Sequence, residues 1–399
     1  MILQRLKRLF LKPTSGIPLT VSLVFFTPIL IASLFNLTFF NYFVSLFGCL
    51  IFLEIAFNFY HRLVRGHAYK IPKKIPFEKI HVEPHPYIPY IYKKYADSPP
   101  SELTRYPLHR GKYFTSKLKT NNFKFFNGEN GDRDIIVPKP KNLFRIACLG
   151  ASTTQNYITH NNKNYSYPLE LEKILKSKLD QNLEVNNCGQ GGYTTADILV
   201  RFMLQVCDTD PDAIIIYEAH ADVRSYLIPN FQSDYSHSRK NLGEAYWKLK
   251  LGSKIPNTPL NFINYFFSHW APYNTRLSLI ELVQKGQLKE DADFRKGLIS
   301  YKRNLQHLID SCKSKKIDVI LSTYCHFLYD EIKNDSMHIL YNQIIEKENE
   351  IMKDLAIQNG LKIIDNASLI PKEKKYFVDT VHFSHLGMME LAKNLSKAF

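Results

Sequence analysis

Residues 143–154 read Leu-Phe-Arg-Ile-Ala-Cys-Leu-Gly-Ala-Ser-Thr-Thr, an apolar run that passes directly into a turn of small residues. A short apolar run bounded by glycine is typical of a buried β-strand. The turn presents the hydroxyl of Ser152 at the start of a helix, where backbone N–H groups stabilise negative charge. Serine is also a preferred helix N-cap, so in isolation a capping role is the simpler explanation of this residue.

Four similar runs follow this one, and helix-length amphipathic segments separate them. The five expected strands cover residues 143–149, 183–187, 213–217, 318–322 and 361–364. The expected helices cover residues 167–179, 195–207, 294–315, 337–359 and 386–397. Alternation of this kind predicts an α/β domain over residues 142–399, with a flavodoxin-like, doubly wound sheet of five parallel strands.

One interval of this domain, about residues 224–293, breaks the alternation and is rich in aromatic residues. Long insertions in α/β units are usually functional or disordered, and the aromatic content argues against a solvated linker. Three interpretations stay open: a cap or lid near the strand ends, a surface that touches a membrane, or a packed helical elaboration.

The first 141 residues differ in character from the rest. Residues 66–141 are rich in Pro, Tyr and Lys, and they predict an extended connector that packs on the domain and carries short β-pairs. Residues 17–60 form an apolar run with Glu54 as its only formal charge. A bilayer-spanning helix needs about 20 apolar residues, so residues 1–65 predict a membrane anchor of two transmembrane helices, about 17–35 and 39–59.

The charge distribution supports a membrane partner. Residues 1–141 carry 21 Lys and Arg against 8 Asp and Glu, whereas residues 142–399 carry 31 against 29. A basic leader in front of a nearly neutral domain argues against nucleic acid and indicates membrane lipids, bound through the hairpin and its basic flanks. Both flanks are basic, so the positive-inside rule places the domain on the cytoplasmic face. If only one segment spans the membrane, the domain lies outside the cytoplasm.

The chemistry is expected at the carboxyl ends of the strands, where open α/β sheets bind ligands. Asp379 and His382 stand three residues apart in a loop before the last helix. His382 can accept a proton from Ser152, and Asp379 can hold the imidazole in the required tautomer.

No cofactor is expected. His385 lies close to His382 in sequence, but no third ligand has a suitable spacing, so a metal site is not predicted. The six cysteines show no C-x-x-C spacing, and neither a Walker-type nor a Gly-x-Gly-x-x-Gly motif is present.

These features together resemble the SGNH (GDSL-type) hydrolases, a family of esterases and lipases with a flavodoxin-like fold. The resemblance covers residues 143–399 and rests on three blocks, at residues 146–154, 187–194 and 379–382. The segment Lys139-Pro140-Lys141 is also similar to the connector of membrane-anchored bacterial members.

The resemblance implies a role for each site residue. Ser152 stands at the nucleophile position, and Asp379 and His382 complete a Ser-His-Asp set. The backbone N–H groups of Ser152 and Gly192 correspond to the oxyanion hole.

The chain departs from the family at one point. Where the family has Gly-x-Asn-Asp, this chain has Ala219-His220-Ala221-Asp222, so Ala221 replaces an asparagine that serves as an oxyanion donor. Losing one such donor typically costs about 10²–10³ in rate. His220 or a residue of the insertion is then needed as donor, or the enzyme is slow or a transferase, or the site binds without turnover.

The sequence therefore predicts a membrane-anchored serine ester hydrolase, which acts on acyl or acetyl esters of a glycan or lipid. Two alternatives remain close to this reading: an acyltransferase on a surface polysaccharide, and a degenerate pseudo-esterase that binds glycan or lipid. A structural or assembly protein is a third class that the sequence does not exclude.

Overall fold

The computed structural model describes residues 38, 41–42, 44–45, 82–83, 85–98, 114–115, 117–228, 230–238 and 293–399. The expected transmembrane segments, 17–35 and 39–59, lie almost entirely outside these residues. Within the described ranges, no helix is both long enough and apolar enough to cross a bilayer. The chain divides into two compact units, Met1–Lys74 with Lys254–Trp270, and Ile75–Ser253 with Ala271–Phe399. The second unit contains the sheet and the candidate site.

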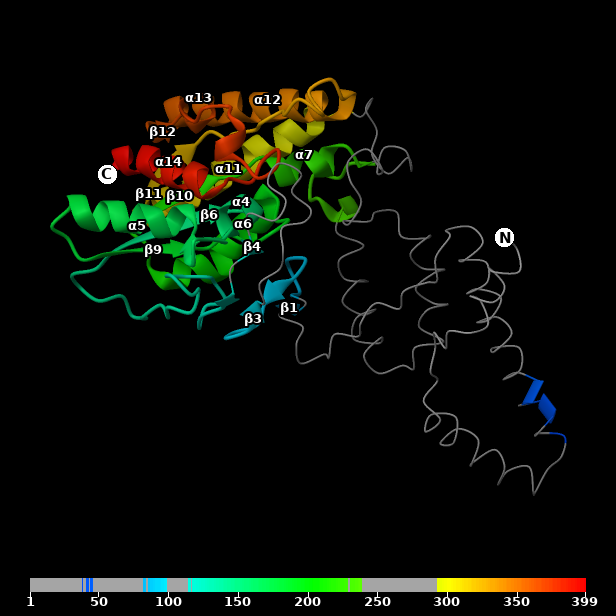
Figure 1. Ribbon diagram of the computed structural model, residues 1–399, viewed down its shortest axis with the longest axis horizontal. Coiled ribbons are helices and arrows are strands. Elements are labelled where there is room, and N and C mark those ends of the chain that lie inside the picture. The colour runs from blue at the N-terminus through cyan, green and yellow to red at the C-terminus, as the bar shows by residue number, and fades with distance from the viewer. Residues whose placement is uncertain are drawn as a thin grey trace. The chain divides into compact units, whose positions relative to one another are not determined.

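The centre of this unit is a parallel sheet of five strands (Figure 1). The strands are β6 (Phe144–Gly150), β9 (Leu183–Asn187), β10 (Ala213–Tyr217), β11 (Asp318–Ser322) and β12 (Lys362–Ile364). Their order across the sheet is β12-β11-β10-β6-β9, and every neighbouring pair is parallel. This is the flavodoxin-like strand order of doubly wound folds. The predicted five-stranded parallel sheet is therefore confirmed.

Two groups of helices cover the sheet. The helices are α4 (Ser152–Gln155), α5 (Tyr167–Lys178), α6 (Thr195–Arg201), α7 (His220–Tyr226), α11 (Arg295–Ser314), α12 (Ser336–Asn359), α13 (Asn366–Leu369) and α14 (His385–Leu395). Helix α5 packs against α14, whereas α11 packs against α6, α7 and α12. Local signals set their ends. Ser166 Oγ accepts the N–H of Leu169 at the start of α5, and Gly360 closes α12 with a φ of 65°.

The helix expected over residues 195–207 is wrong in its last turns. Helix α6 ends at Arg201, and the chain continues as a π-helical turn, Phe202–Val206, and a 3₁₀ turn, Cys207–Thr209. Two side chains of this region bond to distant backbone: Arg201 reaches the carbonyl of Gly189, and Gln205 Nε2 donates to the carbonyl of Phe123 at 2.7 Å. These tertiary bonds compete with regular α-helical geometry, which the sequence period alone predicts.

The described part of the connector forms short antiparallel pairs. Strand β1 (Val82–Glu83) pairs with β2 (Ile91–Tyr92), β3 (Asp97–Ser98) with β5 (Leu118–Lys119), and β4 (Phe114–Thr115) with β7 (Ile158–His160), which also pairs with β8 (Lys163–Tyr165). Four buried connector side chains, Ile88, Ile91, Phe125 and Ile135, belong to the same core as the sheet. The connector thus contributes directly to the packing of the domain.

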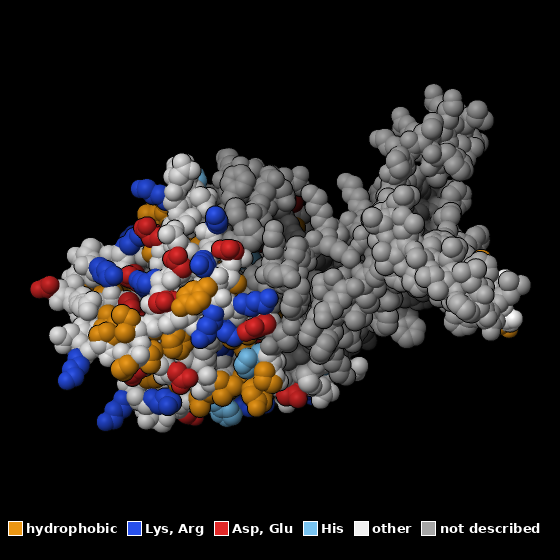
Figure 2. All heavy atoms as spheres, turned by 90° about the horizontal axis from the view of Figure 1, so that it is seen from below, with side chains coloured by type: hydrophobic (Ala, Val, Ile, Leu, Met, Phe, Trp, Pro, Cys, Tyr) orange, Lys and Arg blue, Asp and Glu red, His pale blue; other side chains and the backbone are white. Residues whose placement is uncertain are grey.

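The first residues of the aromatic insertion also join the core. Tyr226 and Tyr235 are fully buried, and the ring of Phe231 makes edge contacts with both. Residues 239–292, on which the lid and membrane-surface interpretations depend, lie outside the described residues. Figure 2 views the molecule from below and shows basic and acidic side chains interspersed over the described part of that surface. This mixture agrees with the near-neutral charge of residues 142–399.

Candidate active site

Ser152 lies at the carboxyl end of β6, where the chain turns into α4. The turn needs Gly150, because a Cβ there would overlap the carbonyl oxygen of Tyr217 and the side chain of Thr154. Ser152 is the first residue of α4, whereas Ala151 occupies the N-cap position and the helix has no side-chain cap. Capping therefore does not explain the serine, and its hydroxyl is directed to another partner.

That partner is His382. Ser152 Oγ lies 2.9 Å from His382 Nε2, and His382 Nδ1 lies 2.8 Å from Asp379 Oδ2. Asp379 Oδ1 also accepts the backbone N–H groups of Val381 at 2.8 Å and of His382 at 2.7 Å. The structure thus brings Ser152, His382 and Asp379, which lie up to 230 residues apart in sequence, into one chain of hydrogen bonds.

The electrostatics of the pair suit proton transfer. Burial opposes ionisation of Asp379, but the charge of His382, its hydrogen bond and the backbone N–H groups outweigh burial and lower the pKa of the carboxyl. Burial alone would lower the pKa of His382, but the charge and hydrogen bond of Asp379 raise it above its usual value. The carboxylate therefore favours a proton on Nδ1, which leaves the lone pair of Nε2 facing Ser152 Oγ.

The loop after β9 places Gly192 beside the nucleophile. Gly192 has a φ of 75°, which glycine adopts without strain. Its neighbour Gly191 is fixed on both sides, since its N–H donates to Gln155 Oε1 at 2.6 Å and its carbonyl accepts from the hydroxyl of Tyr90. Within the described residues, the N–H groups of Ser152 and Gly192 have no protein acceptor.

These groups border a cavity of about 390 Å³. Its wall includes Ser152, Gly192 and His382, which are three of the four residues expected in the site. It also includes Ala221, the residue at which the chain departs from the family. Hydroxyl side chains and Arg224 contribute to the rest of the wall. Asp379 lies behind His382 and acts on the cavity through it.

Residues 219–222, where the family has Gly-x-Asn-Asp, contribute His220 and Ala221 to the cavity wall. Ala221 presents only a methyl group, and its backbone N–H donates to Glu218 Oε1 at 3.0 Å. His220 lines the same cavity, its ring lies 5.4 Å from that of Tyr341, and its buried Nδ1 has no hydrogen-bond partner. Burial, with the nearby His326 as a smaller cause, lowers the pKa of His220 to about 3, so this imidazole is neutral and carries one N–H.

Sequence reasoning missed two residues that shape the site. Glu218 is buried directly after β10 and accepts the N–H of Ala151, next to the nucleophile, at 2.7 Å. Its place at a strand end was the signal that would have found it. Arg201 carries no such signal, because its partners are distant in sequence.

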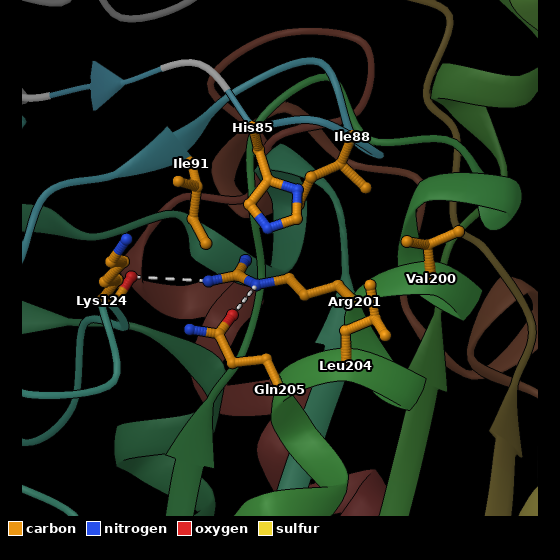
Figure 3. Close-up of a pocket in the computed structure, with 8 residues that line it drawn as sticks. All are labelled: His85, Ile88, Ile91, Lys124, Val200, Arg201, Leu204 and Gln205. Carbon is orange, nitrogen blue, oxygen red and sulfur yellow. Dashed lines mark hydrogen bonds between the residues drawn. The ribbon is translucent and has the colours of Figure 1, made fainter.

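Arg201 fixes the loop that carries Gly192. Figure 3 shows its guanidinium between Lys124 and Gln205 in the wall of a second cavity, of about 150 Å³. Its Nη1 donates to the carbonyl oxygens of Cys188 and Gly189 at 3.3 and 3.4 Å. Its Nη2 donates to the carbonyl of Lys124 at 3.4 Å, and its Nε to Gln205 Oε1 at 3.1 Å. One buried guanidinium therefore ties the connector to the second block.

The described side chains include no group of three or more His, Cys, Asp or Glu arranged to hold a metal ion. His385, which the sequence places near His382, stacks on His160 with 4.0 Å between the ring centroids.

Comparisons with known proteins agree with the sequence motifs. The model of the GDSL-like lipase/acylhydrolase family matches residues 148–389. No curated protein sequence matches the chain. Three similar solved structures are a lipase/acylhydrolase from Enterococcus faecalis (16% identity, TM-score 0.39, 64% of this chain and 94% of that one), an acetylxylan esterase from Geobacillus stearothermophilus (14%, 0.39, 64% and 93%) and a GDSL-like lipase from Bacteroides thetaiotaomicron (15%, 0.36, 66% and 92%). Because the family match spans more than half of the sequence, this chain belongs to the GDSL-like lipase/acylhydrolase family.

Proposed function

We propose that this protein is a membrane-anchored serine ester hydrolase with Ser152 as its nucleophile. The observation that carries the proposal is the 2.9 Å distance between Ser152 Oγ and His382 Nε2, with Asp379 on the far nitrogen of the ring. A serine is a weak nucleophile on its own, and a base within hydrogen-bond reach, oriented by a third group, is the arrangement that activates it.

The proposed reaction has two stages. His382 Nε2 takes the proton of Ser152 as Oγ attacks the acyl carbonyl, and the N–H groups of Ser152 and Gly192 stabilise the oxyanion. His382 then protonates the departing alcohol, which leaves the acyl group on Ser152. Water, deprotonated by His382, attacks the acyl-enzyme, and Ser152 leaves with the proton that His382 returns.

His220 is the proposed third donor to the oxyanion, in place of the missing asparagine. It lies on the wall of the cavity that contains Ser152, and its neutral imidazole has an N–H to donate. A donor aimed at the developing charge is worth about 10²–10³ in rate.

Acyl or acetyl esters of a glycan or lipid are the proposed substrates. The cavity wall carries the hydroxyl groups of Thr194, Ser225 and Ser238 together with Arg224. Pro89, Ala151 and Ile228 add apolar surface to the same wall, so the cavity suits both proposed substrate classes, esters of a glycan and esters of a lipid.

The proposed anchor is the hairpin of about 17–35 and 39–59, with the hydrolase domain on the cytoplasmic face. Its basis is the length of the apolar run and the basic residues on both flanks. Protease treatment of sealed and of inverted vesicles tests the side: digestion of the domain only in inverted vesicles supports the cytoplasmic face, and the reverse places it outside.

Labelling with a fluorophosphonate serine probe tests the nucleophile without knowledge of the substrate. The full-length protein in detergent should be labelled, Ser152→Ala should not, and Ser225→Ala, which removes another hydroxyl from the same cavity, should retain labelling. Labelling that persists in Ser152→Ala would refute the assignment.

Absence of labelling in folded wild-type protein would favour the second candidate function, a pseudo-esterase that binds glycan or lipid. Ala221 is the observation behind this candidate. Ala221→Asn should increase labelling strongly if the oxyanion hole lacks a donor. It should change labelling little if another residue already supplies that donor. Turnover that depends on an added sugar acceptor would instead indicate the acyltransferase.

A further inference from the structure

Arg201, which fixes the loop that carries Gly192, is a buried cation without a carboxylate partner. It is 3% exposed, and among the described residues no Asp or Glu forms an ion pair with it. Its acceptors are uncharged: three backbone carbonyl groups and the side-chain oxygens of Gln190 and Gln205. Its guanidinium also lies 4.6 Å from the ring centroid of Phe125. Buried charges in proteins are normally paired, because the loss of hydration is otherwise poorly compensated.

Another buried arginine of the same domain shows the usual arrangement. Arg145 is fully buried, and its Nε donates to Glu184 Oε1 at 2.5 Å. The acidic residue one turn before Arg201 does not play this part. Asp197 caps α6, where its Oδ2 accepts the N–H and the hydroxyl of Thr194 at 2.9 and 2.8 Å, and no ion pair joins it to Arg201. Within the described residues, Arg201 therefore lacks the counter-charge that Arg145 has.

The second cavity, of about 150 Å³, opens beside this guanidinium (Figure 3). His85 and Lys124 from the connector line it together with Arg201, and none of the described residues in its wall is acidic. Lys124 Nζ pairs with Glu83 at 2.5 Å, but Glu83 does not belong to the wall. The wall thus carries two cations and no anion, around a space that is large enough for an anion of about four or five heavy atoms.

His85 adds a hydrogen-bond donor to this wall. Its Nδ1 accepts the backbone N–H of Tyr87 at 3.3 Å, so the neutral ring carries its hydrogen on Nε2. Burial, and then the charges of Lys124 and Arg201, lower the pKa of His85 and favour this neutral form. Figure 3 shows the ring pointing toward the guanidinium. Arg201 Nη2 has two N–H groups, and its one acceptor within the described residues is the carbonyl of Lys124 at 3.4 Å, so a second N–H is available to a ligand.

We propose that this cavity is a binding site for a small, singly charged oxyanion, a carboxylate or a phosphate group, held by the guanidinium of Arg201 and the Nε2–H of His85. The anion supplies the counter-charge that Arg201 lacks, and the N–H geometry of arginine suits the oxygens of both groups. Because Arg201 Nη1 binds the carbonyl groups of Cys188 and Gly189, the anion orients the residue that fixes the oxyanion loop. The inference goes beyond the proposed hydrolase function and does not depend on it.

Thermal unfolding of the full-length protein in detergent tests the site. Sodium phosphate and sodium acetate are the probes, and sodium chloride at equal ionic strength is the reference. Concentrations stay below about 10 mM, where the non-specific stabilisation by phosphate is small. An anion at tenfold its Kd should raise the Tm by about 3–6 °C above the chloride reference. A rise with either probe supports the site, and the lower midpoint identifies the preferred group. No rise with either probe would overturn the inference.

Two neighbouring residues supply a variant and its matched control. Leu204 lines the cavity and is 53% exposed, so Leu204→Glu places a carboxylate at the wall without removing a core side chain. The tethered carboxylate takes the place of the anion, and the rise in Tm should be lost. Met203 is 44% exposed and does not line the cavity, so Met203→Glu adds the same charge nearby and should retain the rise.

A third variant tests the donor from the connector. His85→Phe keeps a ring of similar size and removes the N–H, so it should weaken the apparent affinity for the anion by about tenfold, the scale of one hydrogen bond to a charged group. Unchanged affinity would contradict the role of His85. His307→Phe, which changes an exposed histidine of α11 outside the cavity wall, should leave the affinity unaltered.

The remaining outcomes also decide. A rise that persists at full size in Leu204→Glu would mean that the anion binds elsewhere, and a rise lost equally in Met203→Glu would mean a general effect of surface charge. Either result would overturn the site. If Leu204→Glu does not fold, the comparison of His85→Phe with wild type still provides the test. None of these measurements requires an active Ser152, so failure of the hydrolase proposal is seen separately, in the labelling experiment.

Discussion

The carboxylate of Asp379 contacts both the backbone and the ring of His382. Oδ1 accepts the backbone N–H of His382 at 2.7 Å, and Oδ2 lies 2.8 Å from Nδ1. The spacing of three residues lets one carboxylate fix both the loop conformation and the orientation of the imidazole. The position of Nε2 opposite Ser152 Oγ follows from this double contact.

Replacing Asp379 by asparagine should therefore lower labelling of Ser152 by about 10³–10⁴-fold, the scale seen when a triad aspartate is amidated. The amide presents an N–H₂ group to Nδ1 and favours the wrong tautomer. Loss of the carboxylate also removes the cause that raises the pKa of His382, so the rising limb of the pH profile should move to lower pH. Labelling rates measured against pH give both quantities.

The chain supplies a matched control for this variant. Asp335 and His338 show the same spacing, and Asp335 Oδ1 likewise contacts both the backbone N of His338, at 2.9 Å, and its Nδ1, at 2.6 Å. Asp335→Asn should leave labelling unchanged. An equal loss in both variants would mean that the effect is structural.

Two glycines of the second block should respond differently to alanine. A Cβ on Gly189 would overlap the backbone nitrogen of Gln155, so Gly189→Ala should displace α4 or prevent folding. A Cβ on Gly192 meets nothing within 4 Å, and only its φ of 75° opposes the change. Gly192→Ala should cost about 1–2 kcal/mol of unfolding free energy, the penalty of a left-handed residue with a side chain. Thermal unfolding of both variants measures the difference, and similar melting temperatures would contradict it.

Removing the hydroxyl of Tyr90 should loosen the oxyanion loop. That hydroxyl donates to the carbonyl of Gly191, and a neutral hydrogen bond contributes about 1 kcal/mol, or roughly fivefold in rate. Tyr90→Phe should slow labelling by about this factor. Tyr87→Phe is the control, since Tyr87 is 66% exposed, and it should have no effect. A wild-type rate in Tyr90→Phe would show that the loop holds its position without the connector.

Arg201→Leu should destabilise the domain and slow labelling together. The change leaves the carbonyl groups of Cys188 and Gly189 without their donor, at a cost of about 3 kcal/mol for two buried acceptors. Arg295→Leu removes an exposed arginine that pairs with Asp293, two residues before it, and it should change neither property. Thermal unfolding and labelling rates provide the test; loss of neither in Arg201→Leu would refute the bracing role.

The central strands were predictable because buried parallel strands are continuous apolar runs. Strands β10 and β11 begin and end at the expected residues, Ala213–Tyr217 and Asp318–Ser322. The end of α6 could not be predicted, because the hydrogen bonds that divert the chain there reach residues 123 and 189. Periodicity records the face that a helix buries, and it carries no information on bonds of this range.

The same distinction applies to the site. Ser152 is visible in the sequence because it follows the end of a strand, and Asp379 and His382 because they stand three residues apart in the loop before the last helix. Spacing alone is insufficient, as the second Asp-x-x-His pair at Asp335 and His338 demonstrates. The bracing by Arg201 depends on the folded chain, and the transmembrane hairpin remains a prediction.

Pro89 and Tyr90 form part of the cavity wall, although both precede the first strand of the sheet by more than fifty residues. A segment that is to carry the complete site into another protein must therefore include more than the α/β domain. A chimera that joins residues 142–399 to a foreign anchor would carry the nucleophile but lack one wall of its cavity. A crossover point upstream of Val82 keeps the strand pair β1–β2, and with it the complete site.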